Sequence, residues 1–266
     1  MFFIGQEHIM ASLGDILTYT YETKKGVSIL FRGASGYGKT EIAKKCCNFI
    51  VGRDYQYCLG NNVEFDNNKL VHLIDEIHLM KEPEILYPII DEGKYVFVFA
   101  TNFDSLLPEA LTNRCKNFIF TEYSDEELID IFKFHAKLQF RDSIIKHIVD
   151  VSGRNPRIMI KTFLSNLEIH YMNKKEELIV KSDEELIETI DKIHGIKGGL
   201  DKISRHYLDT LKHLGGRSSI NLLSATANLD INTMKYTIEP ALLYKKLIKI
   251  TNKGRELVEG INYDVL

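Results

Sequence analysis

The 266-residue chain lacks any long apolar run, because its longest, Tyr95 to Ala100, has only six residues. A helix that crosses a membrane needs about 20 apolar residues in succession. The first residues, MFFIGQEHIM, also lack the basic start and the apolar core of a signal peptide. We therefore expect a soluble protein with no membrane partner, located in the cytoplasm, or in a host's cytoplasm if a virus encodes it.

Cysteine is scarce, and its spacing excludes two common uses. The chain has four cysteines, Cys46, Cys47, Cys58 and Cys115, which include an adjacent pair but no C-x-x-C motif. Zinc sites and disulfide frameworks of small secreted proteins need more regular spacings. We therefore expect reduced thiols.

The chain also lacks a large net charge, but its charge is unevenly distributed. The formal net charge is -3. Residues 196–266 carry eleven Lys and Arg against seven Asp and Glu, and the preceding residues carry 23 against 30. A basic carboxyl-terminal module on an acidic body favours an anionic partner, although a solvated face with a few extra lysines gives the same count.

A glycine-rich loop is the strongest chemical signal in the chain. The apolar run from Val27 to Phe31 is typical of a strand, and a segment with helical spacing follows the loop. Such a loop turns backbone N–H groups around a β-phosphate, while its lysine reaches the β- and γ-phosphate oxygens and its threonine holds Mg²⁺. The loop residues are Gly33, Ala34, Ser35, Gly36, Tyr37, Gly38, Lys39 and Thr40.

Two adjacent acids end a second apolar run, VHLIDE. A nucleotide-hydrolysing site needs one carboxylate to hold Mg²⁺ and another to orient the attacking water. We assign Asp75 to the metal and Glu76 to the water. In isolation the same pair could simply cap the next helix.

A third apolar run, YVFVFATN, ends in Asn102. Its amide could hydrogen-bond the γ-phosphate or the water, and we include it among the catalytic candidates. Asn is also an ordinary turn residue at the end of a strand.

In their order along the chain, the Gly33 loop, IDEIH, FATN, LPEALTNRC and SGRNPR resemble the motifs of the AAA+ ATPases, and more narrowly those of the RuvB-type motors of Holliday-junction branch migration. The resemblance runs nearly end to end. FIGQ, which contains Ile4, is similar to the adenine-side box of that family, and GGLD, IEP and TNKGR are similar to its winged helix.

The resemblance implies roles that spacing alone does not give. Arg114 matches the arginine finger that reaches the nucleotide of a neighbouring subunit, so the active unit would be a homo-oligomer, with a hexameric ring as the family's form. Arg157 matches the second-sensor arginine of the helical lid. Without the resemblance, each would be an ordinary surface arginine. The implied cofactors are ATP and Mg²⁺.

We predict an α/β P-loop core of the AAA+ type in residues 1–121, with a parallel sheet covered by helices. Residues 122–195 read as an all-α helical lid, in which Ser124 and Glu127 have the spacing of a capping box. Residues 196–266 read as a winged helix.

The last module contains two candidate helices of a helix-turn-helix, followed by the wing LIKITNKGRELV. Lysines and arginines gather around this wing and suit contact with phosphates. We choose Lys249, Lys253 and Arg255 as DNA candidates. Winged helices also dock proteins, and that alternative stays open.

Only Glu92, Gly93 and Lys94 lie between the segments EILYPIID and YVFVFATN. At this place RuvB-type proteins carry an extra hairpin that docks the partner RuvA, and clamp-loader ATPases have a similarly short connection. Two functions therefore remain: a translocase on duplex or branched DNA in recombination, repair or replication, and an ATP-dependent loader that places an oligomer or a further DNA-processing protein on DNA.

Overall fold

The computed structural model describes residues 3–263, and its internal contacts divide the chain into two units, residues 1–123 and 124–266. The predicted boundary at residue 121 lies close to this division. The further boundary predicted at residue 195 falls inside the second unit and stays a prediction.

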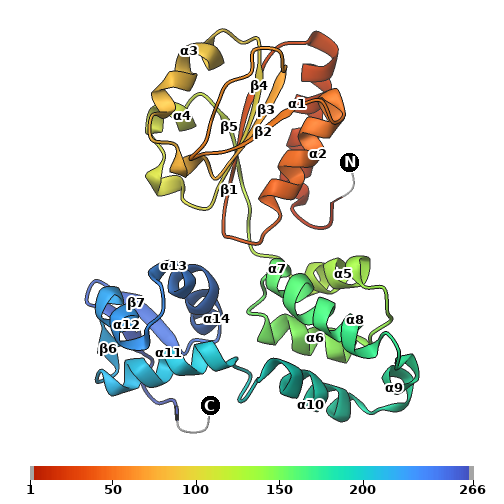
Figure 1. The fold of residues 1–266 in the computed structure, drawn as a ribbon, viewed down its shortest axis with the longest axis vertical. Helices are drawn as coiled ribbons and strands as arrows, with labels where there is room; N and C mark the ends of the chain where they lie inside the picture. Colours follow the sequence, from red (N-terminus) through yellow and green to blue (C-terminus); the bar gives the residue numbers. More distant parts are fainter. Residues whose placement is uncertain (1–2, 264–266) are drawn as a thin grey trace. The chain divides into compact units, whose positions relative to one another are not determined.

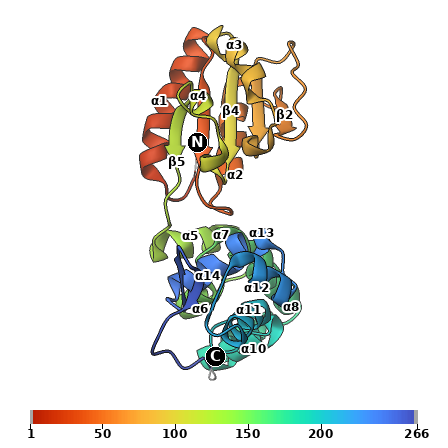
Figure 2. The same ribbon diagram turned by 90° about the vertical axis from the view of Figure 1, so that its left-hand side faces the viewer.

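The first unit is built on a parallel sheet. Its strands lie in the order β2 (Gln56–Leu59), β3 (Val71–Asp75), β4 (Val96–Thr101), β1 (Ser28–Arg32) and β5 (Lys116–Ile119). Every neighbouring pair is parallel. All residues of β3 and β4 are buried, as expected for central strands covered on both faces. Figure 2 shows these strands spread from β5 to β2.

Helices cover both faces of this sheet, as the sequence predicted. Figure 1 shows α1 (Glu7–Thr23) and α2 (Lys39–Val51) on one side, and α3 (Leu86–Asp91) and α4 (Glu109–Thr112) on the other. Strand residues alternate between the two apolar cores, since Ile29 and Phe31 pack with α1 and α2 while Leu30 packs with Leu86 and Leu111. Short 3₁₀ turns follow the strands at Ile77–Leu79, Pro83–Ile85 and Asp104–Leu106.

The second unit begins with a group of lid helices. Capping boxes start two of them, at Ser124 with Glu127 and at Ser182 with Glu185. Continuous helix runs from Pro156 to Tyr171 and contains a π-helical stretch. The elements are α5 (Asp125–His135), α6 (Asp142–Val151), α7 (Pro156–Ile158), η4 (Met159–Leu164), α8 (Ser165–Tyr171), α9 (Lys175–Val180) and α10 (Asp183–His194).

The rest of the second unit is a winged helix, again as predicted. Helices and a small antiparallel sheet in the order β6-β8-β7 enclose one apolar core. The hairpin of β7 and β8 forms the wing. The elements are α11 (Lys202–His213), β6 (Arg217–Ser218), α12 (Ile220–Ala227), α13 (Ile231–Thr233), η5 (Met234–Ile238), α14 (Glu239–Tyr244), β7 (Ile248–Thr251) and β8 (Gly254–Leu257).

Direct contacts join the lid and the winged helix inside the second unit. Lys245 Nζ donates to Asp150 Oδ2 at 2.6 Å, and the Arg154 guanidinium lies 5.1 Å from the ring centroid of Tyr244. A β-carbon on Gly153 would lie 2.6 Å from the β-carbon of Ala241, so the two backbones meet with no space for a side chain. Across the part of the chain that the structure describes, none of the helices has the length and apolar composition needed to span a membrane.

Candidate nucleotide-binding site

The glycine loop joins β1 to α2, at the carboxyl end of the sheet. Gly38 precedes the helix with φ of 89°, in the left-handed region that glycine adopts without steric cost. Lys39 is the first helical residue, so the backbone N–H groups of the helix start and its positive dipole end face the loop. Strand, loop and helix thus occur in the order that the sequence predicted.

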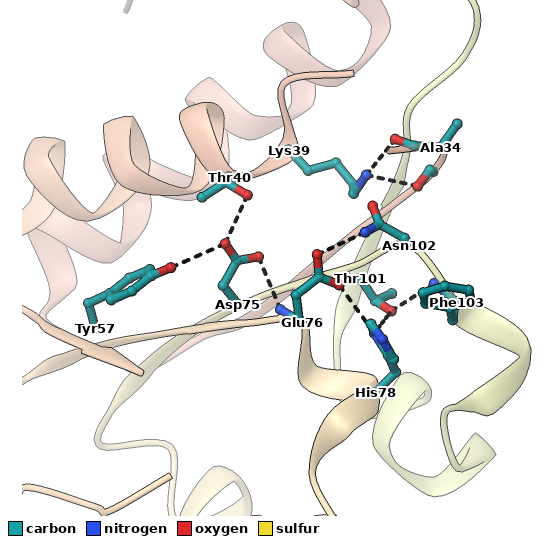
Figure 3. Close-up of polar contacts among 11 residues, drawn as sticks. Ala34, Lys39, Thr40, Tyr57, Asp75, Glu76, His78, Thr101, Asn102 and Phe103 are labelled. Atoms are coloured by element: carbon teal, nitrogen blue, oxygen red, sulfur yellow. Dashed lines mark hydrogen bonds and ion pairs between the residues drawn. The ribbon is translucent and has the colours of Figure 1, made fainter. Parts of the chain in front are cut away.

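Lys39 is held over its own loop. Its side chain is buried, with the residue only 6% exposed, and Nζ donates to the carbonyl oxygens of Gly33 at 2.8 Å and Ala34 at 2.6 Å. Figure 3 shows the ammonium pointing along the loop. A buried ammonium surrounded by backbone dipoles can be drawn to a phosphate that enters the loop.

The two expected metal ligands, Thr40 and Asp75, lie in contact. Thr40 Oγ1 donates to Asp75 Oδ2 at 2.9 Å, and Tyr57 Oη from the edge strand lies 3.4 Å from the same oxygen (Figure 3). Among residues 3–263, no cluster of three or more His, Cys, Asp and Glu could cage a metal ion. A hydroxyl and one carboxylate suit Mg²⁺, which prefers oxygen ligands and completes its shell with water and substrate phosphates.

Glu76 follows β3 and meets Asn102, which follows β4. Asn102 Nδ2 donates to Glu76 Oε1 at 2.8 Å, so the structure brings together two catalytic candidates that are 26 positions apart in the chain (Figure 3). Glu76 has φ of 51°, a left-handed conformation that is uncommon for a residue with a side chain. This bend turns the chain from β3 into the 3₁₀ turn at Ile77–Leu79.

Sequence reasoning missed two residues of this cluster. His78 Nδ1 lies 3.0 Å from Thr101 Oγ1 and 3.4 Å from Glu76 Oε2. Burial lowers the pKa of His78, which favours a neutral imidazole. The available signal was the position of the histidine two residues after the acid pair, and of Thr101 directly before Asn102.

The segment expected on the adenine side is tied to the end of the sheet. Gln6 Nε2 donates to Thr121 O at 2.8 Å, and Thr121 N donates to Gln6 Oε1 at 3.1 Å. Ile4 is half-buried in this segment. A β-carbon on Gly38 would lie 2.7 Å from the ring of Phe3, so this segment lies directly against the glycine loop.

The two candidate arginines belong to other elements of the fold. Arg114 follows α4, and its guanidinium makes a bidentate pair with Asp91, with Nε at 3.0 Å from Oδ1 and Nη2 at 3.1 Å from Oδ2. The same guanidinium lies 4.7 Å from the ring centroid of Tyr87. Arg157 begins α7 in the second unit, where it is exposed.

The wing places its three candidate cations differently. Lys253 is exposed in the turn between β7 and β8, and Lys249 is half-exposed with Nζ 3.4 Å from Glu256. Arg255 is 13% exposed and donates through Nε and Nη2 to Glu239, at 2.8 Å and 3.1 Å. The Arg255 guanidinium is therefore engaged inside the domain, which leaves Lys253 and Lys249 as the cations that face solvent.

Together these features define a class of protein. A lysine and a threonine lie at the glycine loop after β1, paired acids lie at the end of β3, and an asparagine follows β4. Strand β1 lies between β4 and β5. This is the arrangement of a P-loop ATPase of the AAA+ class. A helical lid and a winged helix follow this core.

Comparison with known proteins specifies the relationship. Residues 197–263 match the family of the RuvB C-terminal winged helix domain. The chain is 26% identical to the Holliday junction branch migration complex subunit RuvB of Pseudothermotoga lettingae, over 99% of this chain and 87% of that protein. It is 26% identical to the same subunit of Mycoplasma genitalium, over 95% of this chain and 92% of that one.

Solved structures agree with this relationship at the level of the fold. The structure of the RuvB Holliday junction branch migration motor of Thermotoga maritima superposes with a TM-score of 0.80 at 24% identity, covering 96% of this chain and 93% of that one. These similarities support a RuvB-like AAA+ ATPase.

Proposed function

We propose that this chain is an ATP-driven motor that moves branch points in DNA. The observation that carries the proposal is the joint placement of the glycine loop, Asp75, Glu76 and Asn102 at one edge of the sheet, in a chain that is similar to RuvB subunits along nearly its whole length. The relatives are named for Holliday junctions, and this suggests branched DNA as the substrate.

Hydrolysis would use the side chains as they lie. The glycine loop and Lys39 bind the phosphates, while Thr40 and Asp75 would hold Mg²⁺, which offsets the negative charge of the phosphate oxygens. Glu76 orients a water molecule and accepts its proton. Asn102 fixes the Glu76 carboxylate through their 2.8 Å hydrogen bond and stands beside the position of that water.

Arg114 would complete the site of a neighbouring copy. Its guanidinium is one-third exposed, and its partner Asp91 is itself more than half exposed, so a phosphate can compete with this pair. Because LTNRC resembles the arginine-finger motif of AAA+ ATPases, we assign Arg114 to the trans position and the active form to a homo-oligomeric ring. Arg157 is assigned to the same nucleotide from the lid, and Ile4 to its adenine side.

The winged helix would contact the DNA backbone. Lys253 and Lys249 are the solvent-facing cations of the wing, and residues 196–266 have an excess of basic over acidic side chains. Contacts of this kind give affinity that depends on salt and not on base sequence. The cytoplasm remains the expected location.

A loader or assembly switch is the second candidate, and one feature favours it. The connection from α3 to β4 consists only of residues 92–95, where RuvB-type motors are expected to carry a partner-docking hairpin. A loader would assemble on DNA when it binds ATP and would show little translocation.

The test measures ATP hydrolysis and branch migration on a four-way junction, with linear duplex and no DNA as references, at low and moderate salt. We expect a rate that the junction stimulates and that falls as salt rises. Lys39→Ala should lose nucleotide binding, and Glu76→Gln should bind nucleotide but keep only a small residual turnover. Lys133→Ala, which removes an exposed ion pair with Asp142 among the lid helices, is the control. Hydrolysis indifferent to DNA, with ATP-dependent assembly but no branch movement, would favour the loader.

A further inference from the structure

Two side chains approach the Glu76 carboxylate, and only one of them, Asn102, belongs to the catalytic candidates predicted from the sequence. Oε1 accepts the hydrogen bond from Asn102, and Oε2 faces His78 Nδ1 at 3.4 Å. The same nitrogen lies 3.0 Å from the hydroxyl of Thr101, the residue directly before Asn102. His78 thus connects the end of β3 with the end of β4 at the point where the candidate water would be activated (Figure 3).

The imidazole itself has little freedom to turn away. Its side chain is only 6% exposed, and its ring packs edge-on against Phe103, with centroids 4.4 Å apart. Thr101 is fully buried, and its hydroxyl accepts the backbone N–H of Phe103 at 3.0 Å. The group that faces Glu76 is therefore held by packing on one side and by a hydrogen bond on the other.

The chemistry of these atoms indicates which nitrogen carries the proton. An ionised carboxylate can only accept hydrogen bonds, so an unprotonated Nδ1 would place its lone pair against Oε2. A proton on Nδ1 instead donates to the Thr101 oxygen and turns the positive end of the N–H dipole toward Glu76 Oε2. Because burial lowers the pKa of His78, the imidazole can provide this donor while it stays neutral.

The backbone of Glu76 explains why such a support is needed. A residue with a side chain seldom adopts φ of 51°, and this bend sends the chain into the 3₁₀ turn that carries His78 back toward the carboxylate. The hydrogen bond from Asn102 fixes one oxygen of the carboxylate. The N–H group of His78 beside Oε2 restricts rotation about the carboxyl axis.

We propose that His78 is a positioning residue for hydrolysis: it orients the Glu76 carboxylate and couples it to Thr101 and Asn102 at the end of β4. This inference rests on the proposed function, because it assigns His78 an effect only through Glu76. A water molecule bound beside Asn102 then meets one fixed carboxylate orientation.

The test compares His78→Phe, which keeps a ring against Phe103 but removes the nitrogen, with His78→Asn, whose amide can place a donor near Nδ1. We expect His78→Phe to lower kcat by about 10- to 100-fold, as a small misplacement of a catalytic group does. Nucleotide Kd should change by less than about threefold, because His78 does not contact the glycine loop. His78→Asn should recover most of the lost rate.

Thr101→Val provides an independent route to the same conclusion, since it removes the hydroxyl on the other side of the imidazole without touching His78. It should lower kcat in the same direction, and combining it with His78→Phe should cost less than the product of the two single effects. The matched control is His72→Phe, because His72 is a buried histidine on β3 that bonds to Gln56; this variant should keep the wild-type kcat.

The decisive comparison is made in the Glu76→Gln background. In that background, adding His78→Phe should not lower the residual rate further, because the carboxylate that His78 orients is already absent. Wild-type kcat in folded His78→Phe, or an equal further loss on top of Glu76→Gln, would overturn the inference. Normal turnover by Glu76→Gln would instead overturn the assignment of Glu76, and with it the site of the proposed function.

Discussion

Gly60 lies against the backbone of Glu76 so closely that a β-carbon on Gly60 would be 2.2 Å from the Glu76 carbonyl oxygen. Gly60 N also donates to Asp75 O at 2.8 Å. The residue after the edge strand β2 therefore fixes the position of the backbone from which both candidate acids extend. This position requires glycine because the backbone of Glu76 leaves no space for a side chain on residue 60, whatever the backbone conformation there.

We expect Gly60→Ala to displace Glu76 and to lower kcat by about 10- to 100-fold, since a shift of about 1 Å in a catalytic group has an effect of this size. Nucleotide affinity should change much less, because the glycine loop is not in contact with Gly60. Steady-state hydrolysis and nucleotide titration check both statements. Gly14→Ala is the control: it lies exposed in α1 with open space around it, and should stabilise the fold by about 0.5–1 kcal/mol without affecting kcat. Unchanged kcat in Gly60→Ala would show that the site tolerates the displacement.

Arg114→Ala should retain nucleotide binding and lose about 10³-fold in kcat, as the removal of an arginine finger does. Mixing Arg114→Ala with Glu76→Gln subunits tests whether the arginine acts in trans. Each variant alone lacks one part of every site, whereas a mixed ring contains interfaces with an intact Glu76 and an intact Arg114. Hydrolysis should therefore reappear on mixing. If the two variants assemble together and the mixture stays as inactive as each variant alone, the arginine acts in cis.

Protonation of buried His72 should make the fold less stable in mild acid. Burial lowers its pKa, and its ring stacks on Phe65 with centroids 4.5 Å apart. The unfolded chain therefore binds this proton at a pH where the folded chain does not. The stabilisation is complete above a pH of about 6.5, the unfolded value, and falls by up to about 1.4 kcal/mol per pH unit below it. Urea unfolding at pH 5.5 and pH 7.5 measures how the free energy of unfolding changes with pH. In His72→Phe, the number of protons taken up on unfolding in acid should fall by about one. An unchanged slope would assign the effect to other groups.

Glu239→Gln should destabilise the winged helix strongly. Glu239 is 2% exposed, accepts from Arg255 twice and also accepts from Tyr207 Oη at 3.0 Å. Breaking a buried ion pair on one side leaves an unpaired buried charge and costs roughly 3–5 kcal/mol. Thermal or urea unfolding provides the measurement. Asp209→Asn, which alters an exposed acid of α11, is the control and should have a much smaller effect.

Lys253→Ala should leave the stability unchanged and weaken DNA binding by a similar factor on every sequence. In a plot of log Kd against the logarithm of the salt concentration, the slope should become smaller by about one unit, as expected for the loss of one phosphate contact. Lys192→Ala, exposed on the lid helix α10, offers a comparison with an equal change in charge. Equal weakening by both variants would indicate a general effect of charge, and not a contact made by the wing.

The sequence allowed the fold to be predicted, together with the placement of the candidate acids and Asn102, because the strands and the glycine loop have strong local patterns. Two apolar runs that end in Asp75–Glu76 and in Asn102 are enough to place these side chains at one edge of a parallel sheet. The same reasoning could not find His78 or Gly60. Their effect depends on an approach across the site that no local pattern encodes, and on the left-handed turn at Glu76.

Arg255 illustrates the opposite difficulty. In the sequence it stands beside Lys253 in a basic turn and looks like a DNA contact. Its partner Glu239 is 16 positions away, and pairing with it depends on how α14 packs beside β8. Counting charges along a chain therefore cannot distinguish a cation that faces solvent from one that forms a buried ion pair.

The distribution of the cysteines makes this protein convenient to label. Burial raises the pKa of Cys46 and of Cys115 to about 12 and raises that of Cys47 as well, so these thiols react slowly. Cys58 is the half-exposed thiol, and it lies on β2 next to Tyr57, whose hydroxyl faces Asp75. A maleimide dye would therefore attach selectively at the edge strand without any engineered cysteine, and its fluorescence would report events at the carboxylate end of the sheet.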